Sequence, residues 1–217
     1  MSELSVLTYN MHKGFSGDGR RTFVLPRMRE ALAGSAADVV FLQEAQGEHR
    51  HHAASVEQWP QASQFEFIAD SLWSHHAYGK NALYDHGHHG NAILSRYPLL
   101  DWENVDVSPY PFAASRSLLH GRIEIPEAGR CVHLVCIHFG FIAVERRPQF
   151  GEARQDPLFH GVDPPLVEQR HRRCRQRRGV GAGVDGVCRR RAAAAVVGAE
   201  LRHGLRAQTP RIDNFPV

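Results

Sequence analysis

Apolar and polar residues alternate near the N-terminus in a way that predicts two strands joined by a helix. Residues 4–9 and 38–44 are compact apolar runs, and each ends in polar residues. Between them, apolar residues recur at helical spacing over residues 23–32, with Thr22 as a plausible cap and Pro26 in the first turn. The pattern predicts a strand–helix–strand unit that presents polar groups at the carboxyl ends of its strands.

The middle of the chain predicts further strands. Residues 118–125 and 131–139 alternate as strands joined by a short turn, and residues 92–95 form another apolar run. Because side chains alternate across a strand, His138 lies at the end of an apolar row in the second of these strands. The glycine- and histidine-rich residues 79–90 are expected to form a loop that helps shape specificity.

The pattern decays after residue 141. Prolines interrupt residues 145–170, and residues 172–178 form a basic run. Only residues 192–205 are expected to form an element, a short helix, and no tail segment predicts a convincing strand.

Composition supports a globular chain of two dissimilar parts. The 217 residues are 42% hydrophobic and 23% charged, no apolar run is long enough to span a bilayer, and the four cysteines have no C-x-x-C spacing. With no basic region or cleavage site near the N-terminus, these features predict a cytoplasmic protein. Residues 1–141 hold 11 Lys and Arg against 15 Asp and Glu, whereas residues 142–217 hold 15 Arg, no Lys and 8 acidic residues.

Two side chains at the ends of the first two strands could hold a hard cation. Mg²⁺ takes oxygen ligands from one or two carboxylates, together with amide oxygens and water, so Asn10 and Glu44 could make half of such a site. A glutamate at a strand end is, however, more often simply solvated.

Three further positions could bind phosphate. Arg116 offers a forked donor that suits phosphate oxygens, Asn91 lies in the run G-N-A-I-L-S-R, and His138 titrates near neutrality. Taken singly, Arg116 is better interpreted as a surface charge and His138 as a satisfied core histidine.

Two other features suggest that the chain could bind a transition metal or a nucleic acid. Histidines gather in two stretches and could bind a transition metal, although polar loop residues near a substrate cleft are the favoured interpretation: His49, His51, His52, His75, His76, His86, His88 and His89. The basic residues 170–178 could be a nucleic-acid-binding arm or a solvated charge run, and they lack the interleaved aromatic residues of a stacking platform.

The order of the motifs adds a resemblance. L-T-Y-N-M-H-K-G, V-V-F-L-Q-E, G-N-A-I-L-S-R-Y-P-L, S-R-S-L-L and V-H-L-V-C-I-H-F-G follow one another along residues 3–147. In this order they resemble the endonuclease/exonuclease/phosphatase superfamily of metal-dependent phosphoesterases, and small bacterial members above all. The resemblance implies an α/β fold, a deoxyribonuclease I-like four-layer sandwich with two mixed sheets.

The resemblance also implies roles. Glu44 would bind Mg²⁺ or Mn²⁺ with the support of Asn10, Arg116 and Asn91 would bind substrate phosphate, and His138 would bind phosphate or act as a general acid. The substrate would be a phosphate ester of nucleic acid, phospholipid or sugar.

The C-terminal third departs from the family. The motifs G-D-x-N and S-D-H, which the family mechanism uses after the strand of His138, are absent. Residues 1–147 are therefore expected to be the N-terminal part of the family domain, and residues 148–217 an Arg-rich tail, frame-disrupted or truncated, that leaves the second half of the fold incomplete. Activity would then be impaired, and an uncovered sheet face could favour self-association. The alternative is a non-catalytic, basic-tailed nucleic-acid-binding protein.

Overall fold

The computed structural model describes residues 3–17, 20–108, 115–126, 129–139, 193–199 and 206–208. Their elements are β1 (Glu3–Asn10), the 3-10 turn η1 (His12–Gly14), α1 (Leu25–Gly34), β2 (Val39–His49), α2 (Arg50–Ser55), α3 (Gln64–Ala69), β3 (His75–Tyr84), β4 (Gly87–Ser95), β5 (Leu99–Asp106), β6 (Ser117–Ile125), β7 (Arg130–His138), β8 (Ala193–Ala199) and β9 (Arg206–Gln208).

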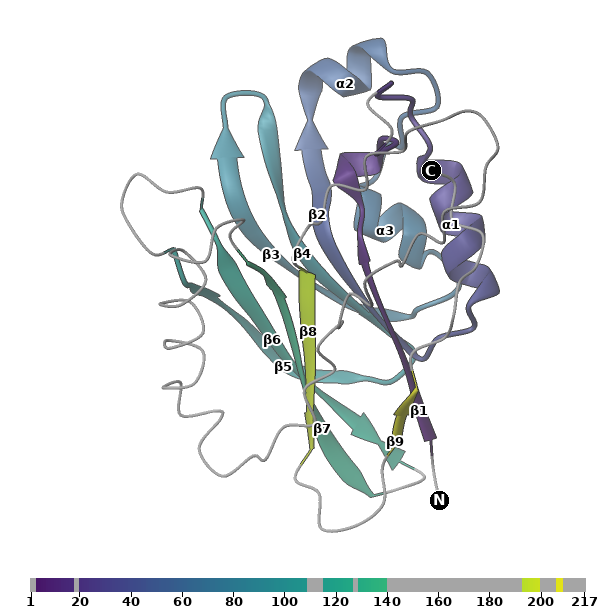
Figure 1. The fold of residues 1–217 in the computed structure, drawn as a ribbon, viewed down its shortest axis with the longest axis vertical. Helices are drawn as coiled ribbons and strands as arrows, with labels where there is room; N and C mark the ends of the chain where they lie inside the picture. The colour runs from purple at the N-terminus through teal and green to yellow at the C-terminus, as the bar shows by residue number, and fades with distance from the viewer. Residues whose placement is uncertain are drawn as a thin grey trace, which may run out of the picture.

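Two sheets face each other (Figure 1). One has the strand order β3-β4-β2-β1-β9 and the other β5-β6-β7-β8. β1 and β2 pair in parallel, as the strand–helix–strand pattern predicts, whereas β2, β3 and β4 pair antiparallel. The first sheet is therefore mixed, whereas the described strands of the second sheet all pair antiparallel. The predicted α/β fold with two sheets is confirmed, and only the first of them is mixed among the described strands.

Apolar rows on the inward faces hold the sheets together. Leu4 and Val6 of β1, Phe41 of β2 and Ile93 of β4 are buried against residues of the second sheet: Leu119, Ile123, Ile125, Val132, Leu134 and Cys136. This core occupies the middle of the sandwich, so the polar residues that continue the same rows lie at its end.

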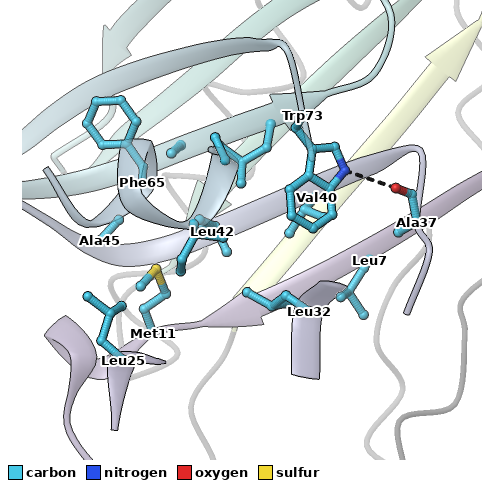
Figure 2. Close-up of a cluster of buried hydrophobic side chains, with 14 residues drawn as sticks. Leu7, Met11, Leu25, Leu32, Ala37, Val40, Leu42, Ala45, Phe65 and Trp73 are labelled. Carbon is cyan, nitrogen blue, oxygen red and sulfur yellow. Dashed lines mark hydrogen bonds between the residues drawn. The ribbon is translucent and has the colours of Figure 1, made fainter. Parts of the chain in front are cut away.

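Helices α1 and α3 cover the other face of the first sheet (Figure 1). Figure 2 shows the core between them, in which Leu32 and Phe65 come from the helices and Leu42 from β2, and Trp73 Nε1 donates to the Ala37 carbonyl at 2.9 Å. No helix among the described residues is long and apolar enough to cross a membrane.

Two details differ from the sequence-based expectations. Thr22 does not cap α1: Val24 precedes the helix, and the Thr22 N–H donates to Ser16 Oγ at 3.1 Å. Residues 79–90 are not a loop but most of a β3–β4 hairpin. Their glycines allow close strand pairing, since a Cβ on Gly90 would lie 1.9 Å from the Gly79 carbonyl oxygen.

The tail also differs from expectation. Residues 193–199 form the strand β8, antiparallel to β7, where a helix was expected, and residues 206–208 pair in parallel with β1 as β9. The expectation that the tail supplies no strand is therefore wrong. The basic run at 170–178 lies outside the described residues.

Candidate active site

Polar side chains continue the inward-facing rows of four strands at one end of the sandwich. Asn10 follows Val6 and Thr8 on β1, Asn91 precedes Ile93 on β4, and His138 follows Leu134 and Cys136 on β7. The two asparagines and the histidine thus come from both sheets. Glu44 on β2 contacts Asn10 and His138, although regular alternation along β2 would place it on the opposite face of the sheet.

A β-bulge turns Glu44 toward the space between the sheets. The pairing of β2 with β4 shifts register between Leu42 and Ala45, and Glu44 has a φ of 53°. The preceding Gln43 already points inward, where its Nε2 donates to Thr8 Oγ1 at 3.0 Å and lies 3.4 Å from Cys136 Sγ. Without the bulge, adjacent side chains would lie on opposite faces of the sheet. The bulge therefore places two consecutive polar residues on one side.

One carboxylate oxygen of Glu44 has contacts from both sheets. Asn10 Nδ2 donates to Glu44 Oε1 at 3.1 Å, and His138 Nε2 lies 3.7 Å from the same oxygen. The amide oxygen of Asn10 accepts from the His12 backbone N–H at 3.0 Å, which fixes the orientation of the amide. The side chains of His138 and Glu44 are only 5% and 12% exposed, so these contacts act in an environment of reduced dielectric.

Asn91 is held rigidly beside this group. It is fully buried, and its Nδ2 donates to the Ser117 carbonyl at 3.0 Å. Its Oδ1 is buried and has no hydrogen-bond partner within the described parts of the chain. Buried polar atoms are nearly always paired, so an orphaned oxygen in a cluster of chemically active side chains is typical of a ligand-facing position.

Arg116 brings positive charge to the same region. It lies directly before β6, and its backbone N–H donates to Ser108 Oγ at 3.0 Å. Its guanidinium lowers the pKa of His89, which places the charge within electrostatic reach of the cluster.

Two residues outside the predicted metal and phosphate set also lie close to these side chains: Lys13, and His89, which the sequence pattern placed among loop histidines near a substrate cleft. His89 precedes Asn91 by two positions on β4, and its pKa is lowered to about 4, chiefly by burial. The charges of Lys13, His138 and Arg116 contribute to this lowering, while Glu44 opposes it. His89 is therefore neutral at neutral pH, and Lys13 is a second cation near the cluster. The sequence signal for His89 was its position two residues before Asn91, because alternate residues of a strand share one face. For Lys13 the only signal was that it follows the first strand.

Three residues at these positions have a strained backbone. His12, Lys13 and Glu44 are non-glycine residues with φ between 51° and 58°, in the left-handed region, which Arg21, Ala36, Gln58 and Ser71 also adopt elsewhere. Such conformations cost about 1–2 kcal/mol each for an L-residue and persist where the surrounding structure enforces them.

The strain at Glu44 predicts an inverted order of stability between two substitutions. Glycine adopts positive φ without steric cost, so Glu44→Gly is expected to be more stable than Glu44→Ala by about 1 kcal/mol. In an ordinary strand position alanine would be the more stable of the two. Urea unfolding of both variants measures the difference, and a more stable alanine variant would show that the bulge is absent.

The side chains present suit a hard cation that protein atoms contact on one side and water or phosphate on the other. Glu44 supplies a carboxylate, and Asn10 orients it through Nδ2 while its own amide oxygen accepts from the His12 N–H. Mg²⁺ commonly binds proteins through one or two carboxylates, while water and substrate phosphate complete its shell. Within the described ranges no group of three or more His, Cys, Asp or Glu side chains could hold a metal by itself.

The histidine stretches are packed as stacked rings. His49 and His52 stack with centroids 3.6 Å apart and planes 8° apart, and His51 stacks on His86 at 3.6 Å. Ring-nitrogen lone pairs lie in the ring plane, so stacked imidazoles direct them side by side instead of toward one ion. These rings do not form a transition-metal centre in the described structure.

Comparison with known proteins places this geometry in a family. The endonuclease/exonuclease/phosphatase family model matches residues 7–198. Over 144 residues, 66% of the chain, it is 49% identical to the uncharacterized protein YbhP of Escherichia coli strain K12, and the match covers 56% of that protein. The chain thus spans little more than half the length of this curated relative.

Solved structures agree on the fold. An endonuclease/exonuclease/phosphatase protein from Beutenbergia cavernae superposes with a TM-score of 0.52 at 22% identity, covering 69% of this chain and 42% of that one. A family protein from Leptotrichia buccalis also gives 0.52, at 10% identity, covering 93% and 89% of the two chains. The family match and the shared two-sheet fold lead to one conclusion: the chain belongs to the endonuclease/exonuclease/phosphatase family.

Proposed function

We propose that the site around Glu44 binds a divalent cation, Mg²⁺ or Mn²⁺, and a phosphate ester, and that it hydrolyses the ester. The observation that carries this proposal is the convergence of Asn10 and His138, from opposite sheets, on one oxygen of Glu44. Membership of the family supports the same assignment.

Each side chain has a distinct task in this proposal. Glu44 would hold the cation with the support of Asn10, which orients the carboxylate, and a bound cation would supply Lewis-acid polarisation of the phosphate and activation of water. Arg116 and Lys13 supply positive charge for the phosphate oxygens, and Asn91 contributes to the same binding surface. His138 stabilises the phosphate or protonates the leaving oxygen.

The chain is expected to be a slow enzyme. The family's water-activating G-D-x-N motif and its S-D-H motif are absent from the sequence, so no aspartate from them assists Glu44. Loss of one well-placed stabilising group commonly costs a hundredfold or more in rate. The site proposed here retains binding groups and lacks part of the catalytic machinery.

Hydrolysis of bis(p-nitrophenyl) phosphate in Mg²⁺ or Mn²⁺ tests this function. The full chain is expected to be at least about a hundredfold slower than a family member that contains both motifs. Its residual activity should fall to background in Glu44→Ala, whereas Glu48→Ala, an exposed position on the same strand, should leave it unchanged. Activity that survives both Glu44→Ala and chelation would refute the site, and a rate equal to that of the complete relative would refute the impairment.

The alternative function, nucleic-acid binding through the Arg-rich tail, stays a prediction because residues 170–178 lie outside the described structure. Self-association through an uncovered sheet face is likewise a prediction.

A further inference from the structure

A row of rings leads away from the proposed phosphate site. Its members touch in sequence: His89 and Tyr84 have ring centroids 5.9 Å apart, Tyr84 and His49 5.7 Å, His49 and His52 3.6 Å, and His52 and Trp59 5.0 Å, with Phe15 5.1 Å from His52. We call these six residues the ring strip. Its first member, His89, is the residue whose pKa is influenced by Glu44, His138 and Arg116.

The ring strip reaches well beyond a single phosphate group. It follows the carboxyl end of β2 past Glu44, and His49 stands five residues further along that strand. At about 3.3 Å per residue this is at most about 17 Å, because register shifts in this part of β2 shorten the path. A ligand that contacts both the Glu44 cluster and the far end of the strip must therefore be longer than a phosphate with one small substituent.

The charges beside the strip suit an anionic ligand. Burial is the main cause that lowers the pKa of His49 and His52, and Lys13 lowers both further, so these rings are neutral at neutral pH. Lys13 also acts on His89, so its charge is within electrostatic reach of rings at both ends of the strip. At the far end, Arg21 lies over the Phe15 ring, with Cζ 5.8 Å from the centroid.

Glu48, the acidic residue next to His49 on β2, has its charge paired with that of Arg50. Glu48 Oε1 lies 3.7 Å from Arg50 Nε, and both side chains are exposed. The cations that act on the far part of the strip are Lys13, which lowers the pKa of His49 and His52, and Arg21, which lowers that of His52. Glu44 is the anion that acts on His89 at the other end.

We infer that the ring strip is a subsite for single-stranded nucleic acid, whose bases stack on the rings while the backbone follows the cations. The inference rests on the proposed function, because the strip begins at the phosphate site. Surfaces that combine aromatic side chains with a positively charged track bind single strands in this way, since every base has a flat face to offer. In a duplex these faces are stacked on one another, and phospholipid and sugar phosphates have none.

Equilibrium binding can test the subsite without turnover. Fluorescence anisotropy of the full chain in a chelator would compare a labelled single strand of about ten nucleotides with an abasic strand of equal length and charge. The base-containing strand is expected to bind at least tenfold tighter, because each stacked base contributes substantially. The inference is overturned if the base-containing and abasic strands bind with equal affinity, or if a duplex of the same length binds as tightly as the base-containing single strand.

Substitutions of single rings test which members of the strip contact the bases. Tyr84→Leu and Trp59→Leu should each weaken binding of the base-containing strand about fivefold or more, and should leave the abasic strand unaffected. Tyr84→Phe keeps the ring and should retain full affinity. Trp102→Leu, which removes an exposed ring from β5 in the other sheet, is the matched control and should change nothing. If neither Tyr84→Leu nor Trp59→Leu has an effect in variants that melt cooperatively, the subsite is refuted.

The two proposals fail differently. If the ring strip is not a subsite, base selectivity disappears while hydrolysis of the small diester still depends on Glu44. If the phosphoesterase assignment is wrong, Glu44 has no effect on hydrolysis while base-selective binding persists.

Discussion

Replacing Phe41 with alanine is expected to lower the free energy of unfolding by about 3–5 kcal/mol. Phe41 is fully buried on β2, the central strand of the five-stranded sheet, and lies in the core between the two sheets. Residues of both sheets surround it, so neighbouring side chains cannot close the cavity without moving a whole sheet. The loss combines the transfer free energy of the ring with the cost of that cavity.

Leu100→Ala is the matched control for this prediction. Leu100 is 46% exposed on β5, and truncating it should change stability by no more than about 0.5 kcal/mol. Urea denaturation of both variants gives the comparison. A loss below about 1.5 kcal/mol for Phe41→Ala would mean that the sheets do not pack on each other at this position.

Periodicity predicted the parts of the fold in which one side of a strand is buried. The alternation on β7 correctly placed His138 at the end of a buried row with Cys136. The strand–helix–strand pattern led to the expectation that Asn10 and Glu44 would lie at neighbouring strand ends. Asn10 does end β1, whereas β2 continues to His49, so the expectation is wrong for Glu44. The two side chains are nevertheless in hydrogen-bond contact. Their roles in binding stay predictions.

Periodicity could not predict local departures from regular pairing. Strict alternation places Gln43 and Glu44 on opposite faces, and only the bulge between Leu42 and Ala45 brings both inward. His89 was hidden for a related reason: the glycines around it suggested a loop, whereas they permit close pairing of β3 and β4. Both errors concern backbone geometry that depends on a partner strand.

The tail shows how tertiary pairing outweighs intrinsic propensity. Alanine is the best helix former, which favoured a helix over the alanine-rich residues 192–205. Residues 193–199 instead pair with β7, because the edge of that strand offers a full row of hydrogen-bonding groups. The hypothesis of a disrupted reading frame thus loses its support from missing strands. It now rests on the tail's composition and on the two absent motifs.

Replacing Glu44 with glutamine is expected to weaken divalent-cation binding at least about tenfold. Glutamine keeps the shape of the side chain and removes its charge, and Glu44 is the one carboxylate to which Asn10 and His138 both lie close among the described residues. Removing a residue that only orients a metal ligand weakens metal binding ten- to a hundredfold. Removing the charge of the ligand itself should weaken it at least as much.

Calorimetric titration of Mn²⁺ into the full chain therefore tests the central claim, that Glu44 is the anchor of a cation site between the sheets. The wild type is expected to bind Mn²⁺, Glu44→Gln to bind it at least tenfold more weakly, and Glu48→Gln, an exposed acidic position on the same strand, to bind it as the wild type does. Equal Mn²⁺ affinity in the wild type and in Glu44→Gln would contradict the claim.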